Sequence, residues 1–360
     1  MQTALPDALA GLGPSDPIVA CAADDGYAMP LAVAIRSVLE HLDPKRRLGL
    51  VVLDGGIGPA NRARLLRSWR PQGARVAWIE PDARVFDDIP TWRYLNRVAY
   101  YRLLLPELLP PEVTRILYLD ADLVVLTDLG PLWDAGLGDR PCLAVQDATS
   151  PYVDARRAMP HWRECTRYGF TPCPIENYAE LGLAPDARYF NSGVLSINLA
   201  RWRQEGITAQ LVACLRANGE HLHAADQYPL NVVLGRRWGQ LDPRWNVPTL
   251  VYGCAGWRQS HFDEATFRRV LEDPYVVHWA GPEKPWNAAV PRADLFHRYR
   301  ALTAWSGLRG RAVIASSRLR TRLRAPARRA RHTWRQLARL VRRPQQRALR
   351  ALRRVLGRVR

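Results

Sequence analysis

Two aspartates separated by one residue, Asp120 and Asp122, are the first candidates for chemistry in this chain of 360 residues. They follow the apolar residues 116–119 and precede a second apolar run, 123–126. A buried strand ending here would place both carboxylates at the carboxyl edge of an α/β sheet, where such sheets bind ligands. These oxygens can hold a hard divalent cation and leave coordination positions for diphosphate oxygens. An aspartate-rich turn is the structural alternative, and the flanking apolar runs favour the metal site.

His278 is the second candidate, because it follows Tyr275-Val-Val at the end of an expected strand. A histidine in this place is either a buried structural residue or a ligand. The sequence Gly281-Pro-Glu-Lys284-Pro-Trp comes next and combines a flexible glycine with a fixed lysine. These are the residues that a loop closing over phosphate needs, so the segment favours a functional histidine.

The elements that must position these side chains form an α/β pattern. From Ile18 onward, short runs rich in Val, Ile and Leu alternate with segments of helical period. Strands are expected at 18–23, 48–53, 76–79, 116–119, 142–145, 190–198 and 275–277, and helices near 30–42, 59–70, 97–105, 199–217 and from 228 onward. Residues 148–188, rich in proline, arginine and aromatic residues, are expected as an excursion from the sheet.

The composition, with 48% hydrophobic and 24% charged residues, fits one large globular domain or two modest ones. The six cysteines form no CxxC pair, as expected for free thiols in a reducing cytosol. The chain shows neither a signal peptide nor 18 consecutive apolar residues, so we expect neither secretion nor a membrane span.

The net charge of +18 belongs to the C-terminal end, where residues 301–360 hold 19 arginines and no lysine or acid. The preceding 300 residues are near neutral, with 33 basic and 34 acidic side chains. Apolar residues recur at helical spacing from Trp334 to Val341 and from Leu349 to Val359, with Pro344 between the two segments. This stripe predicts an amphipathic helical tail that binds an anionic membrane surface. A solvated charge run or a nucleic-acid-binding arm is the alternative, but neither needs an apolar stripe.

An ordered set of motifs gives the chain a family resemblance. The set comprises Ala22-Ala-Asp24-Asp-x-Tyr27, Tyr101-Arg102, Leu117-Tyr-Leu-Asp120-x-Asp122, Tyr189-Phe-Asn191-Ser-Gly193, Asp226-Gln227 and His278-x-x-Gly281-Pro-x-Lys284-Pro-Trp286. With this set the chain resembles glycosyltransferase family 8, the group that contains glycogenin and bacterial galactosyl- and glucosyltransferases of lipopolysaccharide synthesis. The resemblance covers about residues 16–300.

The resemblance implies a GT-A fold, a single α/β domain whose Rossmann-like nucleotide-binding sheet is extended by an acceptor-binding half. On this basis we expect a disordered N-terminus over 1–15, the GT-A domain over 16–304 and the basic helical tail over 305–360. The resemblance also implies that Asp120, Asp122 and His278 bind Mn²⁺ at the diphosphate of a UDP-sugar. Mixed oxygen and imidazole ligands suit Mn²⁺ better than Ca²⁺, and Mg²⁺ is the other candidate cation.

The remaining site residues also follow from the resemblance. Ala22, Asp24 and Gly26 match the uridine-binding stretch, and Gly281 and Lys284 match the residues on the diphosphate. Those that match the positions holding the donor sugar are Arg102, Asp147, Asn191, Asp226 and Gln227. Gln227 matches the residue nearest the β-face of the sugar, and because a neutral amide is a poor nucleophile, attack on the same face as the leaving group is favoured over double displacement.

The resemblance therefore implies a retaining hexosyltransferase that moves galactose or glucose from a UDP-sugar to a lipopolysaccharide or other lipid-linked glycan. We expect such an enzyme in the bacterial cytoplasm, peripheral on the inner face of the cell membrane. A non-catalytic protein that binds sugar nucleotides or nucleic acid is the competing class. Self-glucosylation of the glycogenin kind is a third possibility, and the sequence does not reveal its acceptor tyrosine.

Overall fold

The structure is a computed structural model that describes residues 9–69, 73–90, 97–165 and 170–306. These described residues belong to one compact unit. The predicted amphipathic tail lies outside the described residues. Among those that are described, no helix has the length and apolarity needed to cross a membrane.

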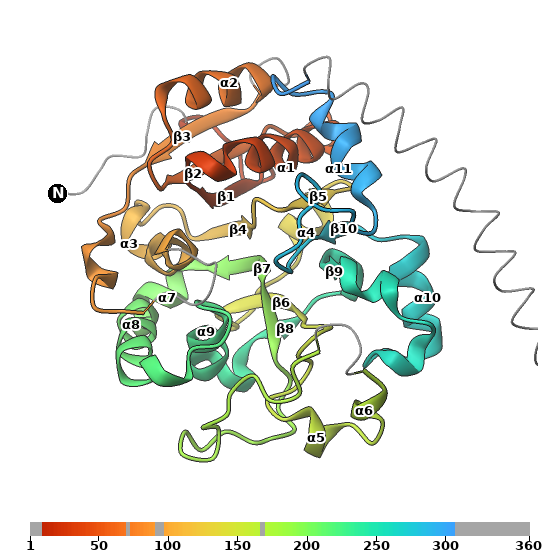
Figure 1. The fold of residues 1–360 in the computed structure, drawn as a ribbon. Coiled ribbons are helices and arrows are strands. Elements are labelled where there is room, and N and C mark those ends of the chain that lie inside the picture. The colour runs from red at the N-terminus through yellow and green to blue at the C-terminus, as the bar shows by residue number, and fades with distance from the viewer. Residues whose placement is uncertain (1–8, 70–72, 91–96, 166–169, 307–360) are drawn as a thin grey trace, which may run out of the picture. The chain divides into compact units, whose positions relative to one another are not determined.

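A seven-stranded sheet with the order β3-β2-β1-β4-β7-β6-β8 forms the centre of this unit (Figure 1). Its strands are β1 (Ile18–Ala23), β2 (Gly49–Asp54), β3 (Arg75–Ile79), β4 (Arg115–Leu119), β6 (Cys142–Gln146), β7 (Phe190–Asn198) and β8 (Gly239–Gln240). β7 runs antiparallel to β4 and β6, while the other neighbouring pairs are parallel. The start of β7 therefore lies at the same edge of the sheet as the ends of β1, β4 and β6.

A small second sheet lies next to the first and has the order β5-β10-β9. Its strands are β5 (Leu123–Val125), β9 (Val247–Pro248) and β10 (Val276–His278). β5 follows β4 after only three residues, so the two aspartates lie at the passage from the large sheet to the small one.

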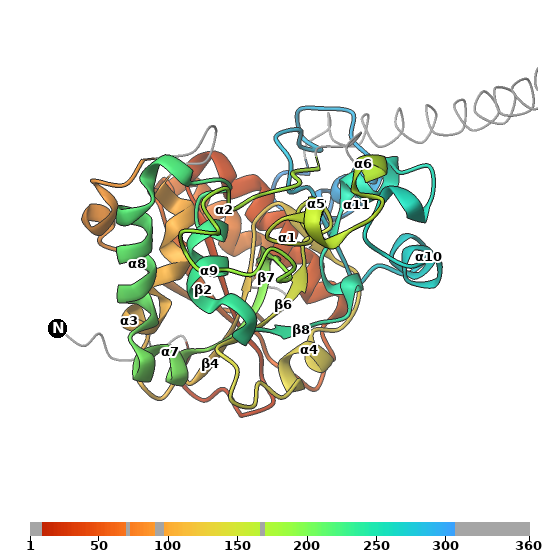
Figure 2. The same ribbon diagram turned by 90° about the horizontal axis from the view of Figure 1, so that it is seen from below.

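Helices cover both faces of the large sheet, and Figures 1 and 2 show α7, α8 and α9 side by side. The helices are α1 (Ala28–His41), α2 (Pro59–Trp69), α3 (Leu105–Leu108), α4 (Gly130–Asp134), α5 (Ala155–Ala158), α6 (Trp162–Cys165), α7 (Leu199–Glu205), α8 (Ile207–Ala217), α9 (Gln227–Leu234), α10 (Glu264–Glu272) and α11 (Ala293–Arg300). A 3₁₀ helix, Arg97–Leu104, leads directly into α3.

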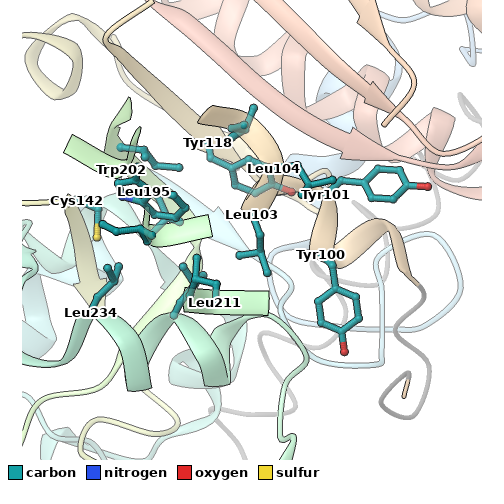
Figure 3. Packing of buried hydrophobic residues seen from close by; sticks show 14 of the residues in the cluster. Tyr100, Tyr101, Leu103, Leu104, Tyr118, Cys142, Leu195, Trp202, Leu211 and Leu234 are labelled. Atoms are coloured by element: carbon teal, nitrogen blue, oxygen red, sulfur yellow. The ribbon is translucent and has the colours of Figure 1, made fainter. Parts of the chain in front are cut away.

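Two apolar layers form because successive side chains of each strand point to opposite faces. On β4, Ile116 and Tyr118 join the layer under α8, whereas Leu117 and Leu119 join the layer under α1. Figure 3 shows part of the first layer, including Leu195 and Leu211. Strands buried on both faces carry continuous apolar runs, which is why the sequence reveals them clearly.

The expected fold class is confirmed, and several elements differ in detail. The single helix expected over 199–217 is divided at Gly206, whose φ of 61° is left-handed and ends α7. Residues 148–188 carry only α5 and α6 as α-helices among their described residues, and Figure 1 shows both helices at the lower edge of the molecule. The disorder expected over 1–15 does not hold for residues 9–15, because Leu9 is buried in the core and Trp133 Nε1 donates to the carbonyl oxygen of Pro14.

Candidate functional site

One cleft gathers most of the predicted site residues at the edge of the large sheet where β1 and β4 end and β7 begins. The predicted residues that line it are Ala22, Asp24, Arg102, Asp120, Asp122, Asn191, Asp226, Gln227, His278 and Lys284. They come from segments that span more than 250 residues of sequence. The two sheets, and the helical segments packed on them, bring these distant residues together.

Asp120, Asp122 and His278 converge as the metal hypothesis requires. Each offers a ligand atom, and these atoms lie within 4.8 Å of one another. His278 Nε2 is 3.1 Å from Asp122 Oδ1 and 3.6 Å from Asp120 Oδ2. The imidazole is nearly fully buried, and 23% of the Asp120 side chain is exposed. Two carboxylates and an imidazole at this separation fit a divalent cation that keeps open positions toward the cleft.

The pairing of β5 with β10 explains why a histidine 156 residues further along the chain meets Asp122. The two strands are antiparallel, with His278 opposite Leu123. The amide N–H of Trp279 also donates to the carbonyl oxygen of Asp122, at 3.0 Å. This ladder fixes the imidazole beside the carboxylates, because the register between β5 and β10 sets the positions of both Asp122 and His278.

Gly193 of β7 lies against two of these three side chains, Asp120 and His278. Its carbonyl oxygen accepts the N–H of Asp120 at 2.9 Å. A Cβ atom at this glycine would lie 2.4 Å from His278 Cε1 and 2.7 Å from Asp120 Oδ2. An irregularity in the β6–β7 pairing lies here, since Ala144 pairs with Leu195 but Val145 pairs with Asn191. The bulge and the absence of a side chain at Gly193 leave room for candidate ligands from two sheets to lie close together.

Arg102 links the metal-site acids to the predicted sugar site. Its Nη2 donates to Asp120 Oδ1 at 2.8 Å, and its Nε lies 3.1 Å from Asp226 Oδ2. The guanidinium lies 4.0 Å from the centre of the Tyr118 ring. Burial raises the pKa of Asp226 to about 6, although the Arg102 charge opposes this rise. Asp226 precedes α9 but caps no backbone N–H with its side chain, so its contact with Arg102 accounts better for its position than helix initiation does.

Lys284 contacts the metal-site acids from the loop after β10. Its Nζ donates to Asp122 Oδ2 and, at 2.6 Å, to the carbonyl oxygen of Trp279. Burial opposes ionisation of Asp122, but the charge of the adjacent Lys284 ammonium holds the pKa of this carboxyl below its usual range. The ammonium thus lies beside the candidate cation position, on the lining of the cleft.

Three predicted site residues, Gly26, Asp147 and Gly281, are not among the lining residues of the cleft. Gly26 lies in the short 3₁₀ turn that Asp24 caps through the N–H of Tyr27. Asp147 follows β6 at the expected edge, but its side chain is 4% exposed and accepts hydrogen bonds within the protein.

Other lining residues were not predicted from the sequence. Val98 and Ala99 of the 3₁₀ helix line the cleft, as does Ala224 before α9. Ala224 and Ala225 have φ values of 57° and 48°, a conformation that is uncommon for residues with a Cβ. Such residues cluster at functional sites, yet alanine in the sequence gives no signal of a left-handed backbone.

The model of Glycosyl transferase family 8 matches residues 18–289. General stress protein A of Bacillus subtilis is 30% identical over 294 residues, which cover 80% of this chain and 94% of that protein. Glycosyltransferase GlyF of Streptococcus pneumoniae is 26% identical over 290 residues, or 80% of this chain and 62% of that protein.

Among solved structures, the galactosyltransferase LgtC in complex with donor and acceptor sugar analogs has a TM-score of 0.65. It is 28% identical, and the alignment covers 79% of this chain and 96% of that one. The likeness therefore covers most of both chains, and it supports the GT-A fold.

The close approach at Gly193 predicts that Gly193→Ala weakens the binding of a divalent cation by at least about tenfold, because the new methyl group must displace His278 or Asp120. Isothermal titration calorimetry with Mn²⁺ measures the affinity. Gly136→Ala is the matched control, since a Cβ there meets nothing within 4 Å. Unchanged affinity in a folded Gly193→Ala protein would contradict the assigned geometry.

Proposed function

The chain belongs to glycosyltransferase family 8, and we propose from this premise that it transfers galactose or glucose from a UDP-sugar to a glycan with retention of anomeric configuration. The acceptor in this proposal is lipopolysaccharide or another lipid-linked saccharide. The proposal makes Mn²⁺ the preferred cation, with Mg²⁺ as the alternative.

The observation that carries the proposal is the convergence of Asp120, Asp122 and His278 on the lining of one cleft. A protein that only bound nucleic acid would gain nothing from two carboxylates there, because they repel phosphate. A diphosphate bound through a divalent cation needs this set of ligands. The similarity to LgtC, solved with donor and acceptor sugar analogs, supports the same reading of the cleft.

The cation, when bound, supplies positive charge against the charge that develops on the UDP leaving group. The residues of the chain have complementary tasks in the proposal. Lys284 adds a second positive charge on the same side of the cleft, and its buried position makes that charge more effective than it would be in water. Arg102 holds Asp120 and Asp226 in place through its two contacts.

Gln227 is assigned a positioning and stabilising task. Its Nε2 donates to Asp147 Oδ2 at 3.0 Å, and its Oε1 accepts the N–H of Ser192 at 3.1 Å. Both ends of the amide are therefore fixed, and a neutral amide is a poor nucleophile. A second lone pair on Oε1 can stabilise positive charge on the sugar while the acceptor attacks from the face that UDP leaves.

We expect Asp122→Ala to lower kcat/KM by at least about 1,000-fold, because a lost cation ligand removes several kcal/mol of leaving-group stabilisation. Gln227→Ala is expected to lower it only about 10- to 100-fold, as for one lost electrostatic contact. UDP release from UDP-galactose and UDP-glucose, with and without Mn²⁺, measures both effects.

Gln210→Ala, an exposed glutamine of α8, is the matched control and should keep full activity. Equal losses in the Asp122 and Gln227 variants would contradict the division of roles. UDP release that is independent of a divalent cation would contradict the proposed function itself.

We also propose that the protein works in the cytoplasm, on the inner face of the membrane. Support comes from the 19 arginines and the regular apolar stripe of the C-terminal segment. Basic residues near anionic lipid contribute about 1 kcal/mol each, and the apolar face adds its own burial energy. A lipid-linked acceptor would be found at the same surface.

Truncation after Trp305 is therefore expected to abolish co-sedimentation with vesicles that contain phosphatidylglycerol. The full chain should bind these vesicles more strongly than vesicles of pure phosphatidylcholine, and added salt should weaken the binding. UDP release in solution checks that the truncated protein is folded. Vesicle binding that survives the truncation would contradict the proposal that the C-terminal segment binds the membrane.

A further inference from the structure

A chain of three side-chain hydrogen bonds runs from Asp147 to the candidate metal site. Asn191 Nδ2 donates to Asp147 Oδ2 at 2.9 Å, and Asn246 Nδ2 donates to Asn191 Oδ1 at 2.8 Å. Asn246 Oδ1 then lies 2.9 Å from His278 Nδ1. Asn246 is 3% exposed and lies immediately before β9 of the small sheet. These hydrogen bonds thus connect the end of β6 and the start of β7 to the imidazole on β10.

The direction of every bond in this chain is determined by its surroundings. Asn191 Oδ1 accepts the backbone N–H of Gly193 at 2.9 Å, and a backbone N–H can only donate. This contact fixes which end of the Asn191 amide carries the oxygen. The Asp147 carboxylate agrees, because ionised oxygens can only accept and Oδ2 faces the Asn191 amino group.

The same carboxylate has little capacity left for a ligand. Its Oδ1 accepts the N–H and the hydroxyl of Thr149 and the N–H of Ser150, at 2.6, 2.7 and 3.0 Å. Its Oδ2 accepts from Asn191 and Gln227. Asp147 is thus positioned to orient two amides rather than to contact a sugar directly.

The orientation of Asn191 sets the orientation of Asn246, and that of Asn246 sets the proton on His278. With the amino group of Asn246 facing Asn191, its carbonyl oxygen must face His278 Nδ1, so Nδ1 carries the hydrogen. In the neutral imidazole the lone pair is then on Nε2, which faces Asp122 Oδ1 and Asp120 Oδ2. Three electron pairs pointing at one position are the arrangement of a cation site.

We infer that Asn246 is a positioning residue that holds His278 in the tautomer and orientation needed for binding a cation through Nε2, with Asp147 as the anchor of the chain. The inference rests on the proposed function, because it takes His278 as a ligand of the cation. The same carboxylate accepts from Gln227, so Asp147 orients two amide side chains that line the cleft, Asn191 and Gln227.

Two substitutions separate this role from packing. Asn246→Leu is similar in size but offers no acceptor to His278 Nδ1, and we expect it to weaken Mn²⁺ binding about 10- to 100-fold. Asn246→Asp also loses the bond to Asn191 but keeps an acceptor at Nδ1, so Mn²⁺ affinity should stay within about threefold of the wild type. Electron paramagnetic resonance of free Mn²⁺, titrated with the full chain in the absence of donor sugar, measures the dissociation constants.

Asn198→Leu is the matched control, because this asparagine lies at the other end of β7, where it caps α7. It should lose stability and keep its Mn²⁺ affinity. Equal losses of affinity in Asn246→Leu and Asn246→Asp would reduce Asn246 to a packing residue and overturn the inference. Wild-type affinity in Asn246→Leu would overturn it as well, while leaving the proposed function standing. Failure of the wild type itself to bind Mn²⁺ would contradict both.

Discussion

The structure depends on positive charge that offsets the buried carboxylates at one edge of the sheet. Asp120, Asp122 and Asp226 lie in or beside one cleft, and burial of carboxylates is unfavourable unless positive charge and hydrogen-bond donors surround them. Arg102 contacts two of these acids and Lys284 the third. His278 faces the remaining oxygens, and a bound divalent cation would complete the compensation. The cleft is thus built for a positively charged ligand that is itself ready to bind diphosphate.

The directions of the strands place the charged side chains next to one another. Because β7 runs against its neighbours, Asn191 and Gly193 at its start meet Asp120 at the end of β4. The short passage from β4 to β5 carries Asp122 into a second sheet, where β10 presents His278. One set of backbone ladders therefore positions all three candidate ligands, and the hydrogen-bond chain through Asn246 orients the imidazole within them.

Most of the fold could be predicted from the sequence, because strands buried on both faces carry continuous apolar runs and end at polar residues. Asp120 and Asp122 line the cleft for the same reason, since they come just after such a strand. Other lining residues, such as Arg102 on the 3₁₀ helix, were expected only from the family resemblance. The absence of Asp147 from the lining of the cleft could not be foreseen, because its side chain binds the N–H groups of Thr149 and Ser150 in the folded loop. Asn246 gave no signal either, since its partners Asn191 and His278 are 55 and 32 residues away.

A pulsed electron paramagnetic resonance spectrum of the Mn²⁺-loaded protein detects nitrogen bound to the ion and therefore tests the cation site directly. We expect coupling to the nitrogen of one imidazole among the eight histidines of the chain, and loss of this coupling in His278→Gln. Bound Mn²⁺ without any nitrogen coupling, or a coupling that persists in His278→Gln, would contradict the convergence of these three side chains on one cation.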